Sequence, residues 1–254
     1  MLSIQQLTLI KGQRLLCQHL NLNILAGEAW LILGMNGSGK STLLSTLAAW
    51  QTAHHGKILL QGQSLADWPA RQRAQQIAWL HQHDNVHFPM SVMAKVLSGC
   101  QTRLSAWQWE NDHDFAQATT LLKELDLAHL ADHDLATLSG GECRRASLAA
   151  ILMQQADVLL LDEPLSQLDI HHQQYALKRL KQEREQGKSL LVVSHDPNHA
   201  RLFATHALLL FGDGRWLAGT TAEVLTAEHL TELYQYPVRA LTEASGTWFV
   251  ADSE

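Results

Sequence analysis

The sequence predicts an α/β protein that has a mainly parallel sheet, an N-terminal antiparallel β subdomain and a helical subdomain. Three continuous apolar runs, Ala29–Leu33, Val158–Leu161 and Leu190–Val193, are typical of strands that are buried on both faces. Segments with helical spacing separate these runs, and strands that alternate with helices favour a parallel sheet. Before Ala29, apolar and polar residues alternate instead, which is typical of strands with one solvated face.

Further strands and a helical region follow from the same patterns. Short apolar stretches predict strands at Ile58–Leu60, Ile77–Leu80 and Ala207–Leu210, and Tyr175–Leu180 predicts a helix. From about residue 88 to 150, apolar residues recur at spacings of three and four, which favours helices. These residues are Val92, Val96, Phe115, Ala118, Leu121, Leu122 and Leu125.

We therefore expect a single domain over residues 1–254. A helical subdomain at about 88–150 is inserted in its core, and about 220–254 forms C-terminal helices and a strand. Thr220 and Glu223 have the spacing of a capping box, so that two short helices are expected from there to Tyr234. The last predicted strand is Thr247–Ala251.

The composition is that of a globular chain. It has 254 residues, of which 46% are hydrophobic, and a net charge of −6. Since Lys and Arg form no larger cluster than the short groups near Arg71 and Arg144, we expect no nucleic-acid partner. Cys17, Cys100 and Cys143 are far apart, which favours reduced thiols. The apolar runs are far shorter than the roughly 20 residues of a membrane span, so we expect that the chain does not cross a membrane.

A glycine-rich loop follows the run Ala29–Leu33 and precedes a helical pattern. It reads Gly34-Met35-Asn36-Gly37-Ser38-Gly39-Lys40-Ser41-Thr42, which fits the pattern of a P-loop. In such a loop, backbone N–H groups surround phosphates, the lysine reaches the outer phosphates and the serine hydroxyl ligates Mg²⁺. Because strand, loop and helix follow in the required order, we predict a P-loop NTPase core with a bound nucleotide.

Two carboxylates, Asp162 and Glu163, follow the run Val158–Leu161, and Pro164 then breaks the strand. Because adjacent residues on a strand point to opposite sides, the two carboxylates are not expected to share one task. We expect Asp162 to join the Mg²⁺ shell and Glu163 to polarise an attacking water. Solvated acids at a strand end are the alternative, which the P-loop in the same chain disfavours.

His195 follows the run Leu190–Val193 and so lies at the end of another strand. A histidine in such a place is more often a packing or capping residue. Ligands of open parallel sheets, however, bind beyond the carboxyl ends of the strands, where the P-loop and Glu163 are also expected. This coincidence favours a contact between His195 and the outer phosphate.

The stretch Leu138–Glu142, LSGGE, allows two interpretations. In the first, Ser139 and Glu142 form a capping box at the start of a helix. In the second, Gly140 and Gly141 leave backbone N–H groups open to an anion at the positive end of that helix. These five residues alone favour the capping box, and the rest of the chain decides whether an anion also binds.

Taken in order, these motifs resemble the ATP-binding-cassette ATPase subunits of ABC transporters, over nearly the whole chain. The resemblance is carried by six motifs, namely Gly34–Thr42, Gln82, Leu138–Glu142, Asp162–Glu163, Ser166–Asp169 and His195. It implies ATP hydrolysis with Glu163 and His195 as catalytic residues. It also implies nucleotide contacts from the P-loop residues, Gln82, Asp162, Ser139, Gly140, Gly141 and Asp169, and a Mg²⁺ ion held by Ser41, Gln82 and Asp162.

The resemblance also implies a role for the two glycines. Two copies of the chain are expected to pack head to tail, so that Ser139 and the glycine N–H groups of one copy close over the γ-phosphate held by Lys40 of the other. One chain would otherwise have two phosphate-binding helix ends for one triphosphate. Closure on ATP then depends on charge-assisted contacts across the interface.

Within this family the chain is most similar to ATPases of bacterial importers of metal chelates: haem, ferric siderophores and cobalamin. The stretches that suggest it are Ala66-Asp67-Trp68, Phe88-Pro89, Leu148-Ala149-Ala150, Ser194-His195-Asp196-x-Asn198-His199 and Glu223-Val224-Leu225-Thr226. The resemblance implies a peripheral subunit on the cytoplasmic face of the inner membrane. Its partners would be membrane permease subunits and, indirectly, a substrate-binding protein.

Three alternatives remain. The chain could serve an ABC transporter for another substrate, or it could be a soluble non-transport ABC ATPase. Such soluble relatives usually carry two cassettes or a long coiled coil, and this chain has one cassette and no sustained heptads. A P-loop small-molecule kinase is disfavoured, because LSGGE and His195 would have no task in it.

Two departures from the family pattern concern the site. ABC ATPases commonly have an aromatic residue near the start that stacks on adenine, whereas Thr8–Gly12 contains none. We therefore expect aliphatic contacts to the purine and loose base selectivity. Cys143-Arg144-Arg145 follows the signature, where the family usually has a Gln or a similar polar residue at the first or second position.

Overall fold

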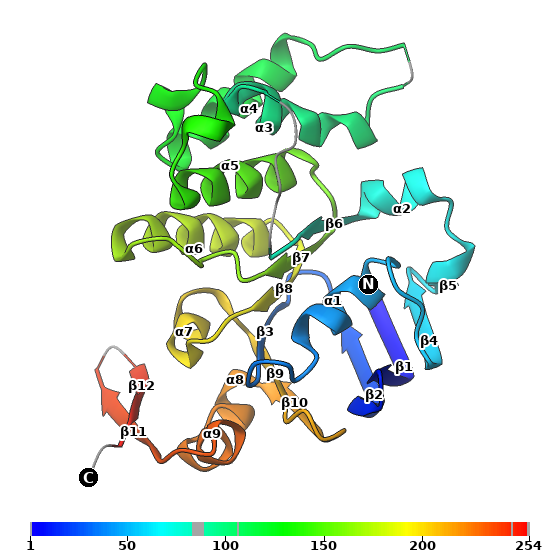
Figure 1. Ribbon diagram of the computed structural model, residues 1–254, viewed down its shortest axis with the longest axis vertical. Coiled ribbons are helices and arrows are strands. Elements are labelled where there is room, and N and C mark those ends of the chain that lie inside the picture. The colour runs from blue at the N-terminus through cyan, green and yellow to red at the C-terminus, as the bar shows by residue number, and fades with distance from the viewer. Residues whose placement is uncertain (1, 83–88, 106, 245, 253–254) are drawn as a thin grey trace.

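The computed structural model describes residues 2–82, 89–105, 107–244 and 246–252. The helices between residues 92 and 153 lie at one end of the molecule, a six-stranded sheet crosses its middle, and the last helices and the C-terminal hairpin lie at the opposite end (Figure 1). Phe88, one of the residues behind the similarity to metal-chelate importers, lies outside the described residues. None of the helices in the described part of the chain combines the length and the apolar character that crossing a bilayer requires.

The central sheet has the strand order β10-β9-β3-β8-β7-β6. All neighbouring strands in it are parallel except β10, which runs antiparallel to β9. The bounds are β3 Ala29–Leu33, β6 Ile77–Leu80, β7 Val158–Asp162, β8 Ser189–Val193, β9 His206–Leu210 and β10 Trp216–Thr220. The predicted mainly parallel sheet is confirmed, and β10 is an addition that the sequence patterns did not reveal.

The alternation of side chains along β3 shows why this sheet is covered on both faces. Leu31 and Leu33 belong to a core cluster shared with the helices of residues 92–180. Trp30 and Ile32 belong to a second cluster shared with the first helix and the N-terminal strands. Because successive strand residues point to opposite faces, one continuous apolar run serves two cores.

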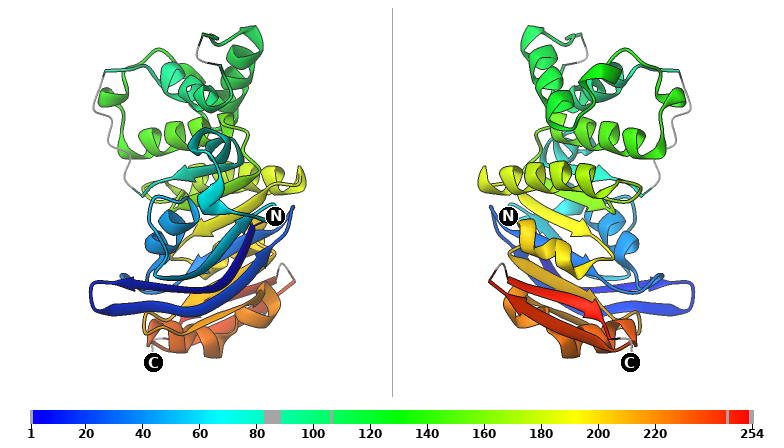
Figure 2. Two further views of the ribbon diagram at one scale, coloured as in Figure 1. Left: turned by 90° about the vertical axis from the view of Figure 1, so that its right-hand side faces the viewer. Right: turned by 90° about the vertical axis from the view of Figure 1, so that its left-hand side faces the viewer.

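The N-terminal part forms a separate antiparallel sheet, as predicted. Its order is β2-β1-β4-β5, and each neighbouring pair is antiparallel. The bounds are β1 Leu2–Lys11, β2 Arg14–Ile24, β4 His55–Leu60 and β5 Gln63–Ser64. Figure 2 shows the long β1–β2 ribbon projecting from the side of the molecule. The turn between β1 and β2 places Lys11 and Arg14 opposite each other.

The region predicted to be helical contains α3 Val92–Leu97, α4 Asp112–Glu124 and α5 Gly140–Met153. Val92, Val96 and Leu122 lie in these helices, as their spacing predicted, and they are buried. Phe115 also lies in α4, in its first turn, but it is 46% exposed. The limits of a helical subdomain at about 88–150 stay a prediction.

The other elements complete the chain. The remaining helices are α1 Lys40–Leu47, α2 Ala70–Gln76, α6 Ile170–Glu185, α7 Ala200–Phe203, α8 Thr221–Val224 and α9 Ala227–Tyr234. Five short 3₁₀ turns occur among the described residues, at Leu65–Asp67, Ser98–Thr102, Ala128–Leu130, Leu135–Thr137 and Pro197–His199. The predicted capping box of Thr220 and Glu223 is present at the start of α8.

The C-terminal strand is half of a hairpin. β12 Gly246–Ala251 matches the predicted strand and pairs with β11 Val238–Glu243, which was not predicted. Every residue of β11 except the first is exposed. Because β11 has no buried face, it lacks the apolar alternation by which a strand is recognised in a sequence.

Leu31 provides a test of the two-faced sheet. Replacing Leu31 by Ala removes a fully buried side chain from β3 and is expected to lower the free energy of unfolding by about 3 kcal/mol. Leu25→Ala is the matched control, because Leu25 is 47% exposed. Urea denaturation measures both changes, and an equal loss in the two variants would contradict the arrangement.

Candidate functional site

The P-loop residues form a tight turn between β3 and α1. Gly37 and Gly39 have φ angles of 78° and 107°, a backbone conformation that favours glycine. A Cβ atom at Gly34 would lie 2.4 Å from Ser38 Oγ and 2.6 Å from the carbonyl oxygen of Leu210. The loop therefore requires these glycines. It ends at Lys40, the first residue of α1, where backbone N–H groups are open to an anion.

Lys40 is buried in the loop and bonded to it. Its Nζ donates to the carbonyl oxygens of Gly34, at 2.7 Å, and Met35, at 3.1 Å. Burial lowers the pKa of Lys40, while the nearby carboxylates of Glu163 and Asp162 raise it. These two carbonyl oxygens keep the buried ammonium group of Lys40 hydrogen-bonded. A charged phosphate oxygen is a stronger acceptor than a carbonyl oxygen, so a bound phosphate could replace them.

Three sequence motifs meet at the side chain of Glu163. The Nε2 atom of His195 lies 2.8 Å from Glu163 Oε1. Gln82 Nε2 donates to the same oxygen at 3.3 Å. These residues follow the ends of β8, β6 and β7, which are neighbours in the parallel sheet. The expectation that His195 and Glu163 lie at the same edge of the sheet therefore agrees with the geometry.

The backbone of Glu163 differs from the expectation. The strand β7 ends at Asp162, and Glu163 has a φ angle of 51°, in the left-handed region that non-glycine residues rarely adopt. The expectation that Asp162 and Glu163 alternate along one strand was thus wrong, because Glu163 lies beyond the end of β7. A left-handed residue of this kind is held by its surroundings and is frequent at functional sites.

Asp162 and Ser41 have the chemistry of a hard-cation site. Asp162 is 2% exposed, and its Oδ1 atom has no hydrogen-bond partner among the described residues. Burial raises the pKa of Asp162, and a hydrogen bond from Ser41 lowers it. A buried carboxylate oxygen beside a hydroxyl matches the oxygen ligands that Mg²⁺ takes in proteins. Gln82, the third predicted metal ligand, contacts Glu163 through its Nε2 atom.

The P-loop, Gln82 and Glu163 line one cavity. It is lined by Lys11, Leu16, Asn36, Gly37, Gly39, Lys40, Ser41, Thr42, Gln82 and Glu163. Lys11 and Leu16 come from β1 and β2 and were not among the predicted site residues. The only sequence signal for them was the missing aromatic residue at Thr8–Gly12. All ten lining residues are described, and none of them is aromatic.

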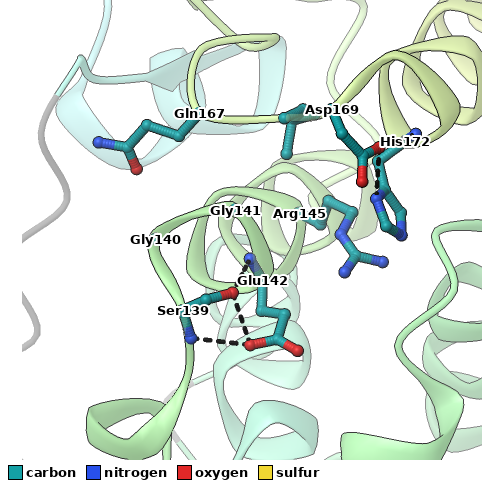
Figure 3. Close-up of a pocket in the computed structure, with 9 residues that line it drawn as sticks. Ser139, Gly140, Gly141, Glu142, Arg145, Gln167, Asp169 and His172 are labelled. Atoms are coloured by element: carbon teal, nitrogen blue, oxygen red, sulfur yellow. Dashed lines mark hydrogen bonds and ion pairs between the residues drawn. The ribbon is translucent and has the colours of Figure 1, made fainter.

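A second cavity surrounds the LSGGE motif (Figure 3). Its lining residues are Ser139, Gly140, Gly141, Glu142, Arg145, Gln167, Leu168, Asp169 and His172, none of which lines the P-loop cavity. The structure therefore brings Gly34–Thr42, Gln82, Asp162, Glu163 and His195 together at one sheet edge. Ser139, Gly140, Gly141 and Asp169 gather in a different place.

The capping box interpretation of LSGGE is confirmed. Ser139 is the N-cap of α5, and its Oγ accepts a hydrogen bond from the Glu142 N–H at 3.4 Å. Glu142 Oε2 accepts from both the N–H and the hydroxyl of Ser139, each at 2.7 Å. These bonds lower the pKa of Glu142. Gly140 is exposed, so the cap does not exclude an anion.

The two glycines also have a packing role within the chain. A Cβ atom at Gly140 would lie 2.4 Å from Gln167 Oε1, and one at Gly141 would lie 2.8 Å from the Gln167 carbonyl oxygen. The start of α5 thus lies close to the segment that leads to Asp169, the N-cap of α6. Gly141 is required by this approach to backbone whether or not an anion binds, whereas a side chain at Gly140 would meet only the flexible end of Gln167.

Arg144 is an important residue whose role sequence reasoning missed. It is 6% exposed, and its guanidinium donates to backbone carbonyls on both sides of the site. Its Nη1 reaches His81 at 2.5 Å and Gln82 at 3.4 Å, while Nη2 reaches Glu163 at 2.9 Å and also Asp162. Arg144 therefore links α5 to the backbone at the end of β6 and at the end of β7. The sequence signalled only that its position departs from the family pattern.

Comparison with known proteins identifies the family. The profile described as "ABC transporter" matches residues 17–166, which include the P-loop, Gln82, the LSGGE motif and both carboxylates. The chain belongs to the ABC transporter family. The matched segment covers the β3–α1 turn, the helices α3 to α5 and the end of β7. The resemblance seen in the sequence motifs is thereby confirmed, and the α/β fold class agrees with it.

Several relatives of this ABC ATPase share its sequence over most of their length. The ferric enterobactin transport ATP-binding protein FepC of Escherichia coli is 35% identical, over 91% of this chain and 85% of FepC. The hemin import ATP-binding protein HmuV of Rhodococcus jostii is 33% identical, over 91% and 78%. The iron(3+)-hydroxamate import ATP-binding protein FhuC of Bacillus subtilis is 32% identical, over 95% and 90%.

Solved structures share the fold of this ABC ATPase. An inward-facing protein described as a metal-chelate type ABC transporter has a TM-score of 0.84 and 29% identity, covering 100% of this chain and 98% of that one. The dimeric bacterial ABC transporter cassette MJ0796 has a TM-score of 0.78 and 24% identity, covering 87% and 99%. The second match, at this identity, shows the fold alone.

Arg144 provides a test of the link between α5 and the two strand ends. Arg144→Ala leaves several buried carbonyl oxygens without a donor and is expected to lower the free energy of unfolding by about 3 kcal/mol. Arg239→Ala, which removes an exposed guanidinium from β11, is the matched control. Equal urea midpoints for the two variants would show that Arg144 does not hold the site together.

Proposed function

We propose that this chain is the ATP-hydrolysing subunit of an ABC importer for a metal chelate, such as haem, siderophore-iron or cobalamin. The observation that carries the catalytic part is the meeting of His195 and Gln82 at one oxygen of Glu163, in the cavity that contains Lys40. The names of FepC, HmuV and FhuC support the cargo class. The chain would lie peripherally on the cytoplasmic face of the inner membrane, against a permease.

The P-loop would hold the triphosphate. Backbone N–H groups from Gly37 to Thr42 surround the phosphates at the start of α1, and Lys40 exchanges its carbonyl acceptors for the outer phosphate oxygens. Ser41 and Asp162 would hold Mg²⁺, and Gln82 would lie between this ion and Glu163, to which its Nε2 donates. When bound, the ion neutralises charge that develops on the phosphates.

Glu163 would orient and polarise the attacking water. Its Oε1 is fixed by His195 and Gln82, so the carboxylate is positioned before substrate arrives. The side chain of His195 is half exposed and would contact the γ-phosphate. Since phosphoryl transfer depends mainly on positioning and electrostatics, fixing this carboxylate is the main contribution of the sheet edge.

A second copy of the chain would complete the site. Ser139 and Gly140 are exposed, and they line a cavity separate from that of Lys40. Head-to-tail pairing would place the α5 N-terminus and Asp169 of one copy opposite the P-loop of the other. The positive end of α5 would then face the γ-phosphate. A substrate-binding protein would act indirectly, by delivering the chelate to the permease.

Glu163→Gln tests the role of the carboxylate. The amide keeps the size of the side chain but cannot take a proton, so ATP binding is expected to persist while hydrolysis falls by about a hundredfold or more. In the presence of ATP, this variant should therefore accumulate as a dimer, which light scattering after size exclusion measures. Glu185→Gln on α6, an exposed position, should hydrolyse normally. Rapid hydrolysis by Glu163→Gln would exclude the assigned role.

A mixing experiment tests the paired site. Lys40→Ala and Ser139→Arg are each expected to be inactive, because every site in either homogeneous dimer contains one defect. In a mixed dimer both defects fall in one site and the other is intact, so an equal mixture should recover up to about a quarter of the parent rate. A mixture as inactive as its components would contradict head-to-tail pairing.

The cargo is tested with the permease. We expect the chain to co-purify with its membrane partner, and a haem, ferric siderophore or cobalamin presented with the substrate-binding protein should raise ATP turnover of the reconstituted complex. Stimulation only by a different class of solute would reject the metal-chelate assignment and leave the ATPase assignment intact.

A further inference from the structure

The C-terminal part of the chain contacts the loop of His195 at two places. Tyr234, the last residue of α9, donates its hydroxyl to the His195 carbonyl oxygen at 3.2 Å. The side chain of Asn198 pairs with Phe249 of β12: Nδ2 donates to the Phe249 carbonyl at 3.0 Å, and the Phe249 N–H donates to Oδ1 at 2.8 Å. One amide side chain thus satisfies both backbone groups of a strand residue.

Neighbouring contacts hold both partners in place. The Arg201 guanidinium lies 3.7 Å from the centre of the Trp248 ring, next to Phe249. The ring of Tyr234 packs against the core cluster that includes Leu230 and Leu233. Burial, together with the charge of Asp196, raises the pKa of Tyr234 to about 12. The hydroxyl therefore stays a donor at neutral pH.

The loop itself forms a connected unit. Ser194 Oγ accepts a hydrogen bond from the Asp196 N–H at 3.1 Å and lies 2.9 Å from His199 Nδ1. Asp196 Oδ1 accepts from the Asn198 N–H at 2.8 Å. Because these bonds join residues 194, 196, 198 and 199, a displacement at Asn198 is transmitted toward His195.

The ring of His195 depends on its backbone for its position. Its side chain is 48% exposed, and its ring meets Glu163 at 2.8 Å. A half-exposed ring has little packing to fix it, so its distance from Glu163 depends on where the His195 backbone is held. The Tyr234 hydroxyl holds that backbone directly, at the carbonyl oxygen.

We infer that Tyr234 and Asn198 are positioning residues for ATP hydrolysis, which place His195 against Glu163 and make turnover depend on the docking of the β11–β12 hairpin. The inference rests on the proposed function. Figure 1 shows the hairpin beside α7, at the opposite end of the molecule from the helices α3 to α5. The C-terminal segment thereby acts on the site through the end of β8, without contributing a group to the P-loop cavity.

Tyr234→Phe removes one hydroxyl and keeps the ring in the core. Loss of this hydrogen bond is expected to lower kcat by about fivefold and to leave the KM for ATP unchanged. Tyr236→Phe is the matched control, because Tyr236 is 48% exposed and loses the same atom; its kcat should equal that of the parent. Asn198→Ala should give the same pattern as Tyr234→Phe through the other contact.

A double-mutant cycle with His195→Ala separates positioning from a general structural effect. If Tyr234 acts through His195, Tyr234→Phe should change the residual single-turnover rate of His195→Ala by less than about 1.5-fold. Hydrogen exchange provides a second measurement: the amides of residues 194–199 should exchange faster in Asn198→Ala, while those of β3 should not.

Three results would overturn the inference. They are a kcat of Tyr234→Phe equal to that of Tyr236→Phe, an equal loss with and without the His195 ring, and unchanged exchange of residues 194–199 in Asn198→Ala. Each of these leaves the proposed function standing, because the parent still hydrolyses ATP. A parent chain that hydrolyses no ATP would instead remove the proposed function itself.

Discussion

The parallel register of the neighbouring strands β3, β8, β7 and β6 is the constraint on which the site depends. In β8 and β7, Val193 is level with Asp162, and in β7 and β6, Leu161 is level with Leu80. The residues that follow these strand ends therefore emerge along one edge, which is how His195, Glu163 and Gln82 meet at a single oxygen. A slip of one residue would move a strand end by about 3.3 Å and break these contacts.

The same edge carries charges that would be costly to bury alone. Lys40 and Asp162 are both buried, and each acts on the pKa of the other. Lys40 is bonded to loop carbonyls, whereas one oxygen of Asp162 lacks a partner among the described residues. A chain that keeps a buried, partly unsatisfied carboxylate gives up stability for function. The Mg²⁺ ion of a bound nucleotide would supply a positive charge beside the unpaired oxygen of Asp162.

Much of this arrangement could be predicted from the sequence, because it depends on local signals. The buried strands appear as apolar runs, the loop of Gly34–Thr42 has a fixed spacing, and the caps at Ser139 and Thr220 follow local hydrogen-bonding rules. Parallel order then places the strand ends at one edge. These signals are sufficient for the fold class and for the residues gathered around Glu163.

What could not be predicted depends on contacts between distant residues or on exposed elements. The exposed β11 has no apolar face to recognise, and Phe115 shows helical spacing although it lies outside the core. The left-handed backbone of Glu163 and the four carbonyls around Arg144 result from tertiary packing. Periodicity carries no information about such contacts, so Arg144 and Tyr234 could be recognised only once the chain was folded.

The most direct test of the account is a crystal structure of the unmodified chain with Mg²⁺ and a non-hydrolysable ATP analogue. The account predicts a triphosphate in the Gly34–Thr42 loop, a Mg²⁺ ion bound by Ser41 and near Asp162, and a γ-phosphate within hydrogen-bond reach of Lys40 and His195. Ser139 of a second copy should lie against the same phosphate. A γ-phosphate that lies away from Glu163, with the sheet edge occupied by solvent, would contradict the account.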